Sequence, residues 1–119
     1  MSLVVEQLWE DMRISGGLSN DRDSESQFLR ALNACISDMN TRLREDLDEV
    51  LAIPSSSIDC EDYQVNAVYA GTKAYLQRQG AWAQDPDAEA FGIFRKELGM
   101  AMSGSIAANS AFKTRTQSA

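Results

Sequence analysis

Two clusters of carboxylates have the side chains and the spacing that could support chemistry in this chain. Their members are Asp46, Asp48 and Glu49 in the first cluster and Asp59, Glu61 and Asp62 in the second. Such groups can bind a divalent cation or act as general acid and base. The second cluster has no further ligand or paired base nearby. We interpret the first cluster as a solvated acidic turn and the second as the charged start of a helix, beside the positive end of its dipole.

The sequence offers no partner for a nucleophile. It contains no histidine, which is the commonest general base and the usual partner of a reactive serine or cysteine. Cys35 and Cys60 form no Cys-x-x-Cys pair, so a zinc site would need carboxylates, which zinc does not favour. Ser55, Ser56 and Ser57 have hydroxyls without a base. We predict a protein that is not an enzyme, has no metal or cofactor, and keeps two reduced, half-buried thiols.

Charge is distributed unevenly along the chain. The 18 Asp and Glu residues and the 11 Lys and Arg residues give a net charge of −7. All acidic residues lie at or before Glu97, and the segment from Leu98 to Ala119 carries only Lys113 and Arg115. An acidic body of this kind should repel nucleic acid. The weakly basic end is either a frayed terminus or a tail that docks on an acidic or mixed surface of a partner.

The 119 residues fit a single domain of modest stability. No apolar run approaches the roughly 20 residues that a membrane span needs, and the first residues lack the features of a signal peptide. We therefore expect a protein made in the cytoplasm, with no membrane partner.

Helical periodicity predicts the elements that position these residues. The first helix runs from Leu3 to Ile14, with Ser2 as N-cap and Gly16-Gly17 as its end. After a polar loop, the second helix covers Glu25 to Arg44. The apolar stripes of the two helices are Val5, Leu8, Trp9 and Met12, then Phe28, Leu29, Leu32, Ile36, Met39 and Leu43.

The segment from Glu45 to Ile58 has no regular pattern. A short strand or hairpin, a helical turn and a loop all fit it, and Pro54 stops a helix from continuing through Ser55. The third helix should begin between Ser57 and Asp59, with one of those two residues as N-cap. It extends to Gln79, and Gly80 supplies a left-handed stop.

Asp85-Pro86-Asp87 predicts the start of a fourth helix, with Asp85 as N-cap and Pro86 at the first helical position. Its buried stripe is Phe91, Phe94, Leu98, Ala101 and Met102. Gly92 and Gly99 should allow close packing against the third helix. Trp82, in the connector, either covers the open end of this hairpin or contacts a second subunit or a partner. The expected fold is mainly α, a small bundle of about four helices.

These features together resemble a known family. The second helix with its run Glu25–Asn33, the irregular Asp- and Leu-rich segment, and the hairpin from Tyr63 through Gly80 and Asp85-Pro86-Asp87 to Leu98 look like the head-tail connector proteins of tailed bacteriophages, also called adaptor or head-completion proteins. The similarity covers about residues 22–105. It consists of apolar spacing, a glycine and an Asp-Pro turn, without a catalytic signature.

The resemblance implies a structural protein of the virion neck, made in the cytoplasm of a bacterial host. About twelve copies would form a ring beneath the portal protein, extend the DNA channel and join the next neck or tail protein. DNA would pass through the ring without sequence-specific binding. An acidic body suits a channel in which DNA must slide.

The resemblance also divides the chain into a helical connector domain, residues 1–102, and an extended C-terminal arm, residues 103–119. In the family this arm reaches into the portal. Here Ile106 and Phe112 would be its apolar anchors, and Lys113 and Arg115 its charged contacts. The arm has too few apolar residues to fold alone, which fits ordering upon binding.

Two other functions remain open. A small acidic regulatory protein could mimic DNA and inhibit a nucleic-acid-binding protein, which predicts carboxylates spaced along one rigid face. An enzyme of another type would need carboxylates that converge in a pocket, and no spacing in the sequence demands this.

Overall fold

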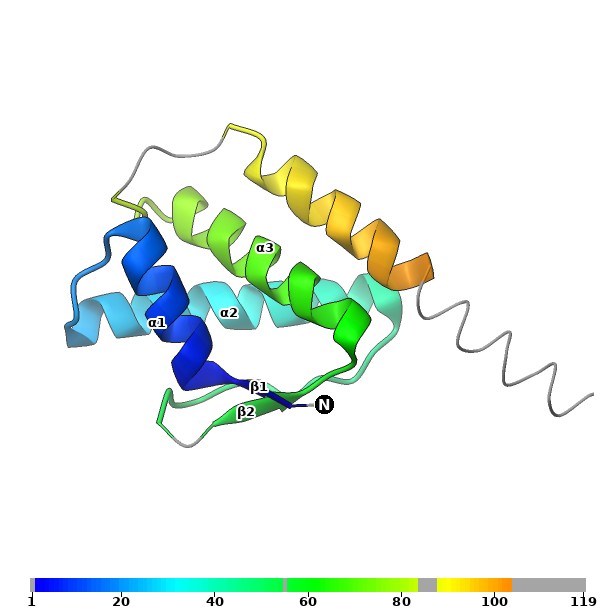
Figure 1. The fold of residues 1–119 in the computed structure, drawn as a ribbon, viewed down its shortest axis with the longest axis horizontal. Helices are drawn as coiled ribbons and strands as arrows, with labels where there is room; N and C mark the ends of the chain where they lie inside the picture. Colours follow the sequence, from blue (N-terminus) through cyan, green and yellow to red (C-terminus); the bar gives the residue numbers. More distant parts are fainter. Residues whose placement is uncertain (1, 55, 84–87, 104–119) are drawn as a thin grey trace, which may run out of the picture.

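The computed structural model describes residues 2–54, 56–83 and 88–103. Over these residues the protein is mainly α-helical, with four helices and one two-stranded antiparallel sheet. In Figure 1, α3 and the helix over residues 90–103 run side by side in opposite directions, and the sheet lies at the far edge of the molecule from that last helix. The predicted helical bundle is therefore confirmed.

The N-terminus begins as a strand. β1, Ser2–Val4, precedes α1, Val5–Gly16, so the prediction of Ser2 as N-cap is wrong. Pairing with a second strand holds Leu3 in extended backbone, and Val4 becomes the N-cap residue. Gly17 ends the helix with φ 67°, a left-handed conformation that glycine adopts without a steric cost. The predicted stripe of Val5, Leu8, Trp9 and Met12 is buried.

The second helix, α2, spans Arg22–Leu43 and begins three residues before the predicted start. Asp21 is its N-cap, because the Asp21 carboxylate accepts a hydrogen bond from the backbone N–H of Ser24 at 2.8 Å. The residues predicted as a polar loop thus include the first helical turn. Phe28, Leu32, Ile36 and Met39 are buried as predicted, whereas Leu29 and Leu43 are partly buried.

The segment after α2 has no regular structure over residues 44–52 and bends at Ile53 and Pro54, and a short strand follows at residues 57–59. β2, Ser57–Asp59, pairs antiparallel with β1, and Leu3 lies opposite Ile58. Among the alternatives left open by the sequence, a loop followed by a short strand is correct. The strand also corrects the predicted start of the third helix, because residues 57–59 are held in extended backbone by their partner.

The third helix, α3, spans Asp62–Arg78, with Glu61 as its N-cap. The Gln64 side chain accepts a hydrogen bond from the Glu61 N–H at 2.8 Å, as in a capping box, which explains why Gln64 is buried. Asp62 lies in the first turn, beside the positive end of the helix dipole. Gly80 follows with φ 75°, which confirms the predicted left-handed stop.

The last described helix covers residues 90–103. The predicted N-cap turn, Asp85-Pro86-Asp87, lies outside the described residues. Phe94, Leu98 and Ala101 are buried as predicted and Phe91 is partly buried, but Met102 is 43% exposed because it lies at the edge of the packed face.

The glycines that allow close helix packing are not those expected from the sequence. Gly92 and Gly99 are exposed, and a Cβ built on either would meet nothing beyond the adjacent residues and backbone of its own helix within 4 Å. The close approach occurs instead at Gly71 of α3, where an added Cβ would lie 2.6 Å from the Phe94 ring and 2.4 Å from Cys35 Sγ. Gly71 therefore joins α3 to both α2 and the last helix.

Candidate functional site

The two carboxylate clusters singled out in the sequence do not come together in one site. Asp59 lies in β2, Glu61 is an N-cap residue and Asp62 begins α3. Asp46, Asp48 and Glu49 are exposed on the connection after α2. In the ranges that the structure describes, no three Cys, Asp or Glu side chains come close enough together to hold a metal ion. Each acid can therefore be assigned a local role in helix capping or surface charge.

Both cysteines are free thiols, and both are more buried than predicted. Cys35 is fully buried beneath Gly71, with its Sγ atom 3.7 Å from the carbonyl oxygens of Ala67 and Val68. Burial raises the pKa of Cys35 to about 12 and also raises the pKa of Cys60. Neither thiol has the character of a nucleophile, which requires an accessible thiolate.

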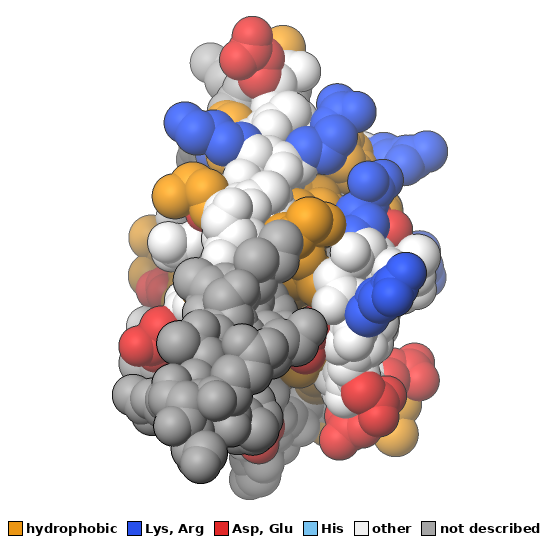
Figure 2. Space-filling view, turned by 90° about the vertical axis from the view of Figure 1, so that its right-hand side faces the viewer, with side chains coloured by type: hydrophobic (Ala, Val, Ile, Leu, Met, Phe, Trp, Pro, Cys, Tyr) orange, Lys and Arg blue, Asp and Glu red, His pale blue; other side chains and the backbone are white. Residues whose placement is uncertain are grey.

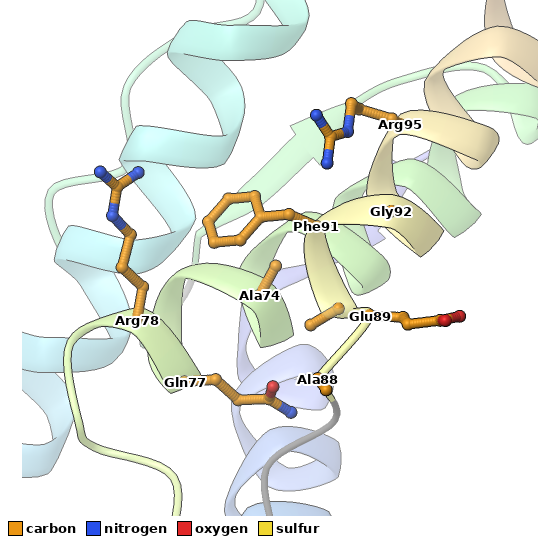
Figure 3. Close-up of a pocket in the computed structure, with 9 residues that line it drawn as sticks. Ala74, Gln77, Arg78, Ala88, Glu89, Phe91, Gly92 and Arg95 are labelled. Atoms are coloured by element: carbon orange, nitrogen blue, oxygen red, sulfur yellow. The ribbon is translucent and has the colours of Figure 1, made fainter.

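The hollow that we consider the candidate site is a cleft between the end of α3 and the start of the last helix. It encloses about 750 Å³. Ala74, Ala90 and the ring of Phe91 contribute its apolar lining, and the guanidinium groups of Arg78 and Arg95 contribute positive charge. Figure 3 shows the side chains of Arg78, Phe91 and Arg95 extending toward the same side, whereas Glu89 points the other way. We call this hollow the basic cleft.

Aromatic contacts hold the basic cleft in place. The guanidinium carbon of Arg78 lies 5.6 Å from the centroid of the Phe91 ring, which is a cation–π distance. The Phe91 ring packs edge-on against Tyr75, with centroids 5.2 Å apart. The Tyr75 hydroxyl in turn donates a hydrogen bond to the Asp38 carboxylate of α2. One chain of contacts thus runs from Arg78 through two rings to α2.

The Tyr75 hydroxyl is held in its neutral form. Burial and the hydrogen bond to Asp38 raise the pKa of Tyr75 to about 12, because an anionic phenolate would lose solvation and face a carboxylate. A matching pair connects α3 to α1, where the Tyr69 hydroxyl donates to Asp11 Oδ2 at 2.7 Å. The same causes raise the pKa of Tyr69 to about 12. These tyrosines support helix packing.

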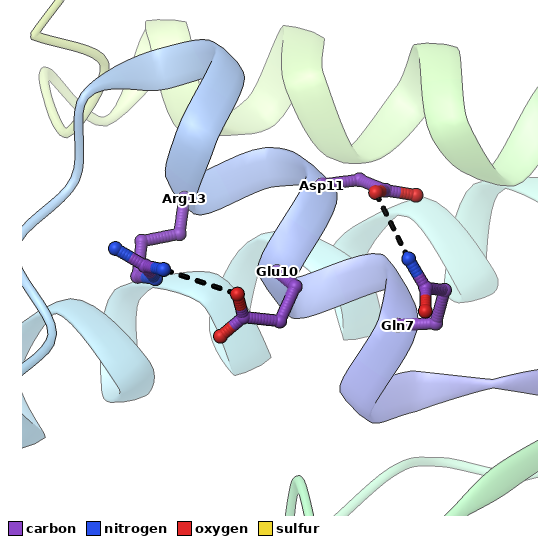
Figure 4. Close-up of polar contacts among 4 residues, drawn as sticks. All are labelled: Gln7, Glu10, Asp11 and Arg13. Atoms are coloured by element: carbon purple, nitrogen blue, oxygen red, sulfur yellow. Dashed lines mark hydrogen bonds and ion pairs between the residues drawn. The ribbon is translucent and has the colours of Figure 1, made fainter.

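The Asp11 carboxylate also orders the outer surface of α1. Its second oxygen accepts a hydrogen bond from the Gln7 side chain at 3.1 Å, one turn earlier. Nearby, Arg13 forms an ion pair with Glu10 at 3.0 Å, and both pairs are visible in Figure 4. A partly exposed pair one turn apart on a helix contributes little to stability. This side of α1 has the features of a solvated helix surface.

A second arrangement, not anticipated from the sequence, fixes part of the acidic connection, the name we give to residues 46–51 after α2. The Asn40 side chain both accepts from the Leu47 N–H, at 2.8 Å, and donates to the Leu47 carbonyl, at 3.0 Å. Asn33 does the same for Val50, at 2.7 and 2.8 Å. The two amides act like the edge of a neighbouring strand. They hold residues 47–50 against α2, with Asp48 and Glu49 exposed between the two attachments.

Trp82 lies against the C-terminal end of α1. A Cβ built on Gly16 would be 2.5 Å from the Trp82 ring, and the Ala83 N–H donates to the Gly16 carbonyl at 2.8 Å. The Lys73 ammonium lies 5.5 Å from the ring centroid. Trp82 is half-buried, so it covers one end of the helices while part of its ring stays accessible to a partner. The partner contact predicted for it stays a prediction.

The arm residues Ile106, Phe112, Lys113 and Arg115 lie outside the described residues. Ser103, the first residue of the predicted arm, is still helical. Within the described part of the chain, no helix combines the length and the apolar character that a bilayer crossing requires.

Figure 2 shows how charges are distributed on one face. Most of its Lys and Arg side chains lie in the upper and middle parts of the view, around a hydrophobic area, with one acidic group at the top and a larger group of Asp and Glu side chains at the lower right. The sequence contained a signal for basic side chains near the end of α3, because residues 63–84 include Lys73 and Arg78 but no acidic residue. The cleft itself could not be predicted from the sequence, because it forms only where α3 and the last helix pack together.

Comparisons with protein-family models, with curated proteins and with solved structures find no match to this chain.

Proposed function

We propose that this protein is a structural assembly protein that acts like the head-tail connectors of tailed bacteriophages. In this role it binds a portal protein at the neck of the virion, assembles with copies of itself into a ring of about twelve, and presents a surface to the next neck or tail protein. It carries out no catalysis. The basis for the family assignment is the resemblance of the helical hairpin and its flanking segments.

One structural observation carries the assembly role. The last described helix exposes Ile93, Met100 and Met102, with 42%, 57% and 43% of their surfaces accessible. These are three of the six large apolar side chains that are exposed in the described residues. They lie on the helix that leads directly into the predicted arm. Exposed apolar side chains gathered on one element favour a contact with another protein.

The nature of the basic cleft also supports a binding function over a catalytic one. Its charged groups are two guanidiniums and Glu89, and its remaining lining is alanine, glycine, glutamine and phenylalanine. A cleft whose described lining presents two arginines, and contains no serine, cysteine or lysine, suits recognition of carboxylates or phosphates. This supports the proposal that the protein recognises partners.

The test combines the full chain with the portal protein encoded beside it. We expect stable attachment in size-exclusion chromatography with light scattering. Deletion of residues 104–119 should leave the helical circular-dichroism signal nearly unchanged and abolish attachment, because the arm supplies the anchors Ile106 and Phe112. A matched control replaces Lys113 and Arg115 by alanine and keeps the apolar anchors. It should weaken attachment mainly at low salt, because salt already screens these charges when its concentration is high. Unchanged attachment after the deletion, or a genome neighbourhood without portal and capsid genes, would contradict the proposal.

A DNA-mimic inhibitor is the second candidate. The observation in its favour is the fixed acidic connection, because Asn33 and Asn40 hold exposed carboxylates on a rigid backbone. This function predicts a monomer or dimer that blocks a nucleic-acid-binding protein and does not attach to a portal. The same chromatography therefore distinguishes the two candidates.

A further inference from the structure

The acidic connection and the basic cleft lie on opposite sides of the molecule. Asn33 and Asn40, seven residues apart, attach the connection to one face of α2. Cys35 and Asp38 contact α3 from the opposite face. In Figure 1 the connection runs along the lower edge, and the helix over residues 90–103 lies along the upper edge. One copy therefore presents an acidic surface and a basic cleft on opposite sides, and the two cannot bind each other within the same copy.

We propose that the basic cleft of one copy binds the acidic connection, residues 46–51, of the next copy. This inference rests on the self-assembly in the proposed function and names its interface. In this contact Arg78 and Arg95 pair with Asp46, Asp48 or Glu49, and Leu51 packs on the ring of Phe91. Because the two surfaces differ, each bound copy leaves one cleft and one connection available, which is the condition for a ring or a filament.

The chemistry of the two surfaces is complementary in two respects. Arginine guanidiniums bind carboxylates with paired, charge-assisted hydrogen bonds, and the connection exposes three carboxylates within four residues. Leu51, which follows them, is 81% exposed, the most of any large apolar residue in the described ranges. The apolar lining of the cleft, Phe91 with Ala74 and Ala90, provides a surface that would cover it.

The connection is also prepared for binding. The four hydrogen bonds between the Asn33 and Asn40 side chains and the backbone of Leu47 and Val50 fix this stretch, so little chain entropy is lost when the intervening Asp48 and Glu49 are bound. A segment held in this way is a better ligand than a mobile acidic tail. This favours a second copy of the chain as occupant over an unrelated acidic peptide, because the required ligand is present at equal concentration and in a fixed form.

The experiment uses charge exchange between two variants of the full chain. The first variant, Arg78→Glu with Arg95→Glu, makes the cleft acidic, and the second, Asp46→Lys with Asp48→Lys, makes the connection basic. In each variant alone, the cleft and the connection carry charge of the same sign and repel each other. Its self-association should therefore be at least roughly tenfold weaker than that of the wild type, a loss of about 1.4 kcal/mol or more. An equimolar mixture restores opposite charges at every contact, so its association should return.

Sedimentation equilibrium measures the average mass at protein concentrations up to about 1 mM, which detects a Kd of that order. Wild-type association should weaken as salt rises from about 0.01 to about 1 M, because the Debye length falls from about 30 to about 3 Å. Leu51→Ser should weaken association at every salt concentration, since it removes the apolar contact. Circular dichroism checks that each variant keeps its helices.

Lys96→Glu is the matched control. Lys96 is exposed on the same helix as Arg95 but does not line the basic cleft, so its replacement should leave association unchanged. A wild type that stays monomeric under all these conditions, a mixture that does not recover, or an equal effect of Lys96→Glu would overturn the inference. Portal attachment by the two charge variants would then show that the proposed function survives without this interface. Recovery in the mixture without any portal attachment would support the interface and count against the connector role.

Discussion

Gly71 of α3 and Phe94 of the last helix lie so close that no side chain fits between them. A Cβ built on Gly71 would be 2.6 Å from Phe94 Cε1 and 2.4 Å from Cys35 Sγ. Because both neighbours are fully or almost fully buried, neither can move aside without disturbing the core.

Gly71→Ala should therefore destabilise the protein even though alanine favours helices. We expect a loss of about 1–3 kcal/mol in the free energy of unfolding, measured by urea denaturation, because the added methyl overfills a packed core. Gly99→Ala is the control, since the space around Gly99 is open. It should raise stability by roughly 0.5–1 kcal/mol through helix propensity alone. Equal effects at the two positions would contradict the packing at Gly71.

Stability should fall at strongly alkaline pH because of the two tyrosine–aspartate pairs. Folding raises the pKa of Tyr69 and Tyr75 from 10.0 to about 12, so the folded state favours the protonated phenols. Their contribution is fully present below pH 10 and is lost as the pH rises toward 12. Thermal unfolding followed between pH 9 and about 12 should show this decline.

The double variant Tyr69→Phe with Tyr75→Phe is the comparison for this alkaline decline. It removes both hydroxyls and should make the stability less dependent on pH in that range. Part of the decline should persist, because Cys35 also has a raised pKa in the folded protein, from 9.0 to about 12. A double variant with the same alkaline decline as the wild type would show that the tyrosines are not its cause.

The two thiols should be protected from reagents in the native protein. Cys35 is fully buried and Cys60 is 4% exposed, and burial raises both pKa values, so little thiolate is available at neutral pH. A colorimetric disulfide reagent should label neither cysteine rapidly at pH 7.5, and both after unfolding in guanidinium chloride. Rapid labelling of Cys35 without denaturant would mean that the contact between α2 and α3 opens readily.

Asn40→Ala should loosen the acidic connection without melting the helices. The substitution removes both hydrogen bonds to Leu47 and should cost about 1–3 kcal/mol, since the Leu47 N–H loses its partner in a partly buried position. Hydrogen exchange should show a faster-exchanging Leu47 amide. Asn66→Ala, on the exposed face of α3, is the matched control and should change neither stability nor exchange by a comparable amount.

Sequence periodicity was sufficient for the helices because each one has its own apolar stripe. Val5, Leu8, Trp9 and Met12 recur at helical spacing, and burial of that stripe requires no knowledge of the partner. The glycine stops at Gly17 and Gly80 were equally local, because a left-handed residue after a helix is determined by the nearby backbone. The helix starts were less accurate. β1 and β2 pair across more than fifty residues, and this pairing displaced two predicted caps.

By itself, the sequence determined a mainly helical protein with an acidic body and no histidine, because composition and local spacing require no partner. Only the tertiary structure decided that Gly71 allows close helix packing, that Asn33 and Asn40 hold the acidic connection, and that Arg78 and Arg95 line one cleft with Phe91. Each of these depends on which helix faces which. That choice is made by the simultaneous burial of several stripes in one core, and no single segment of the chain contains it.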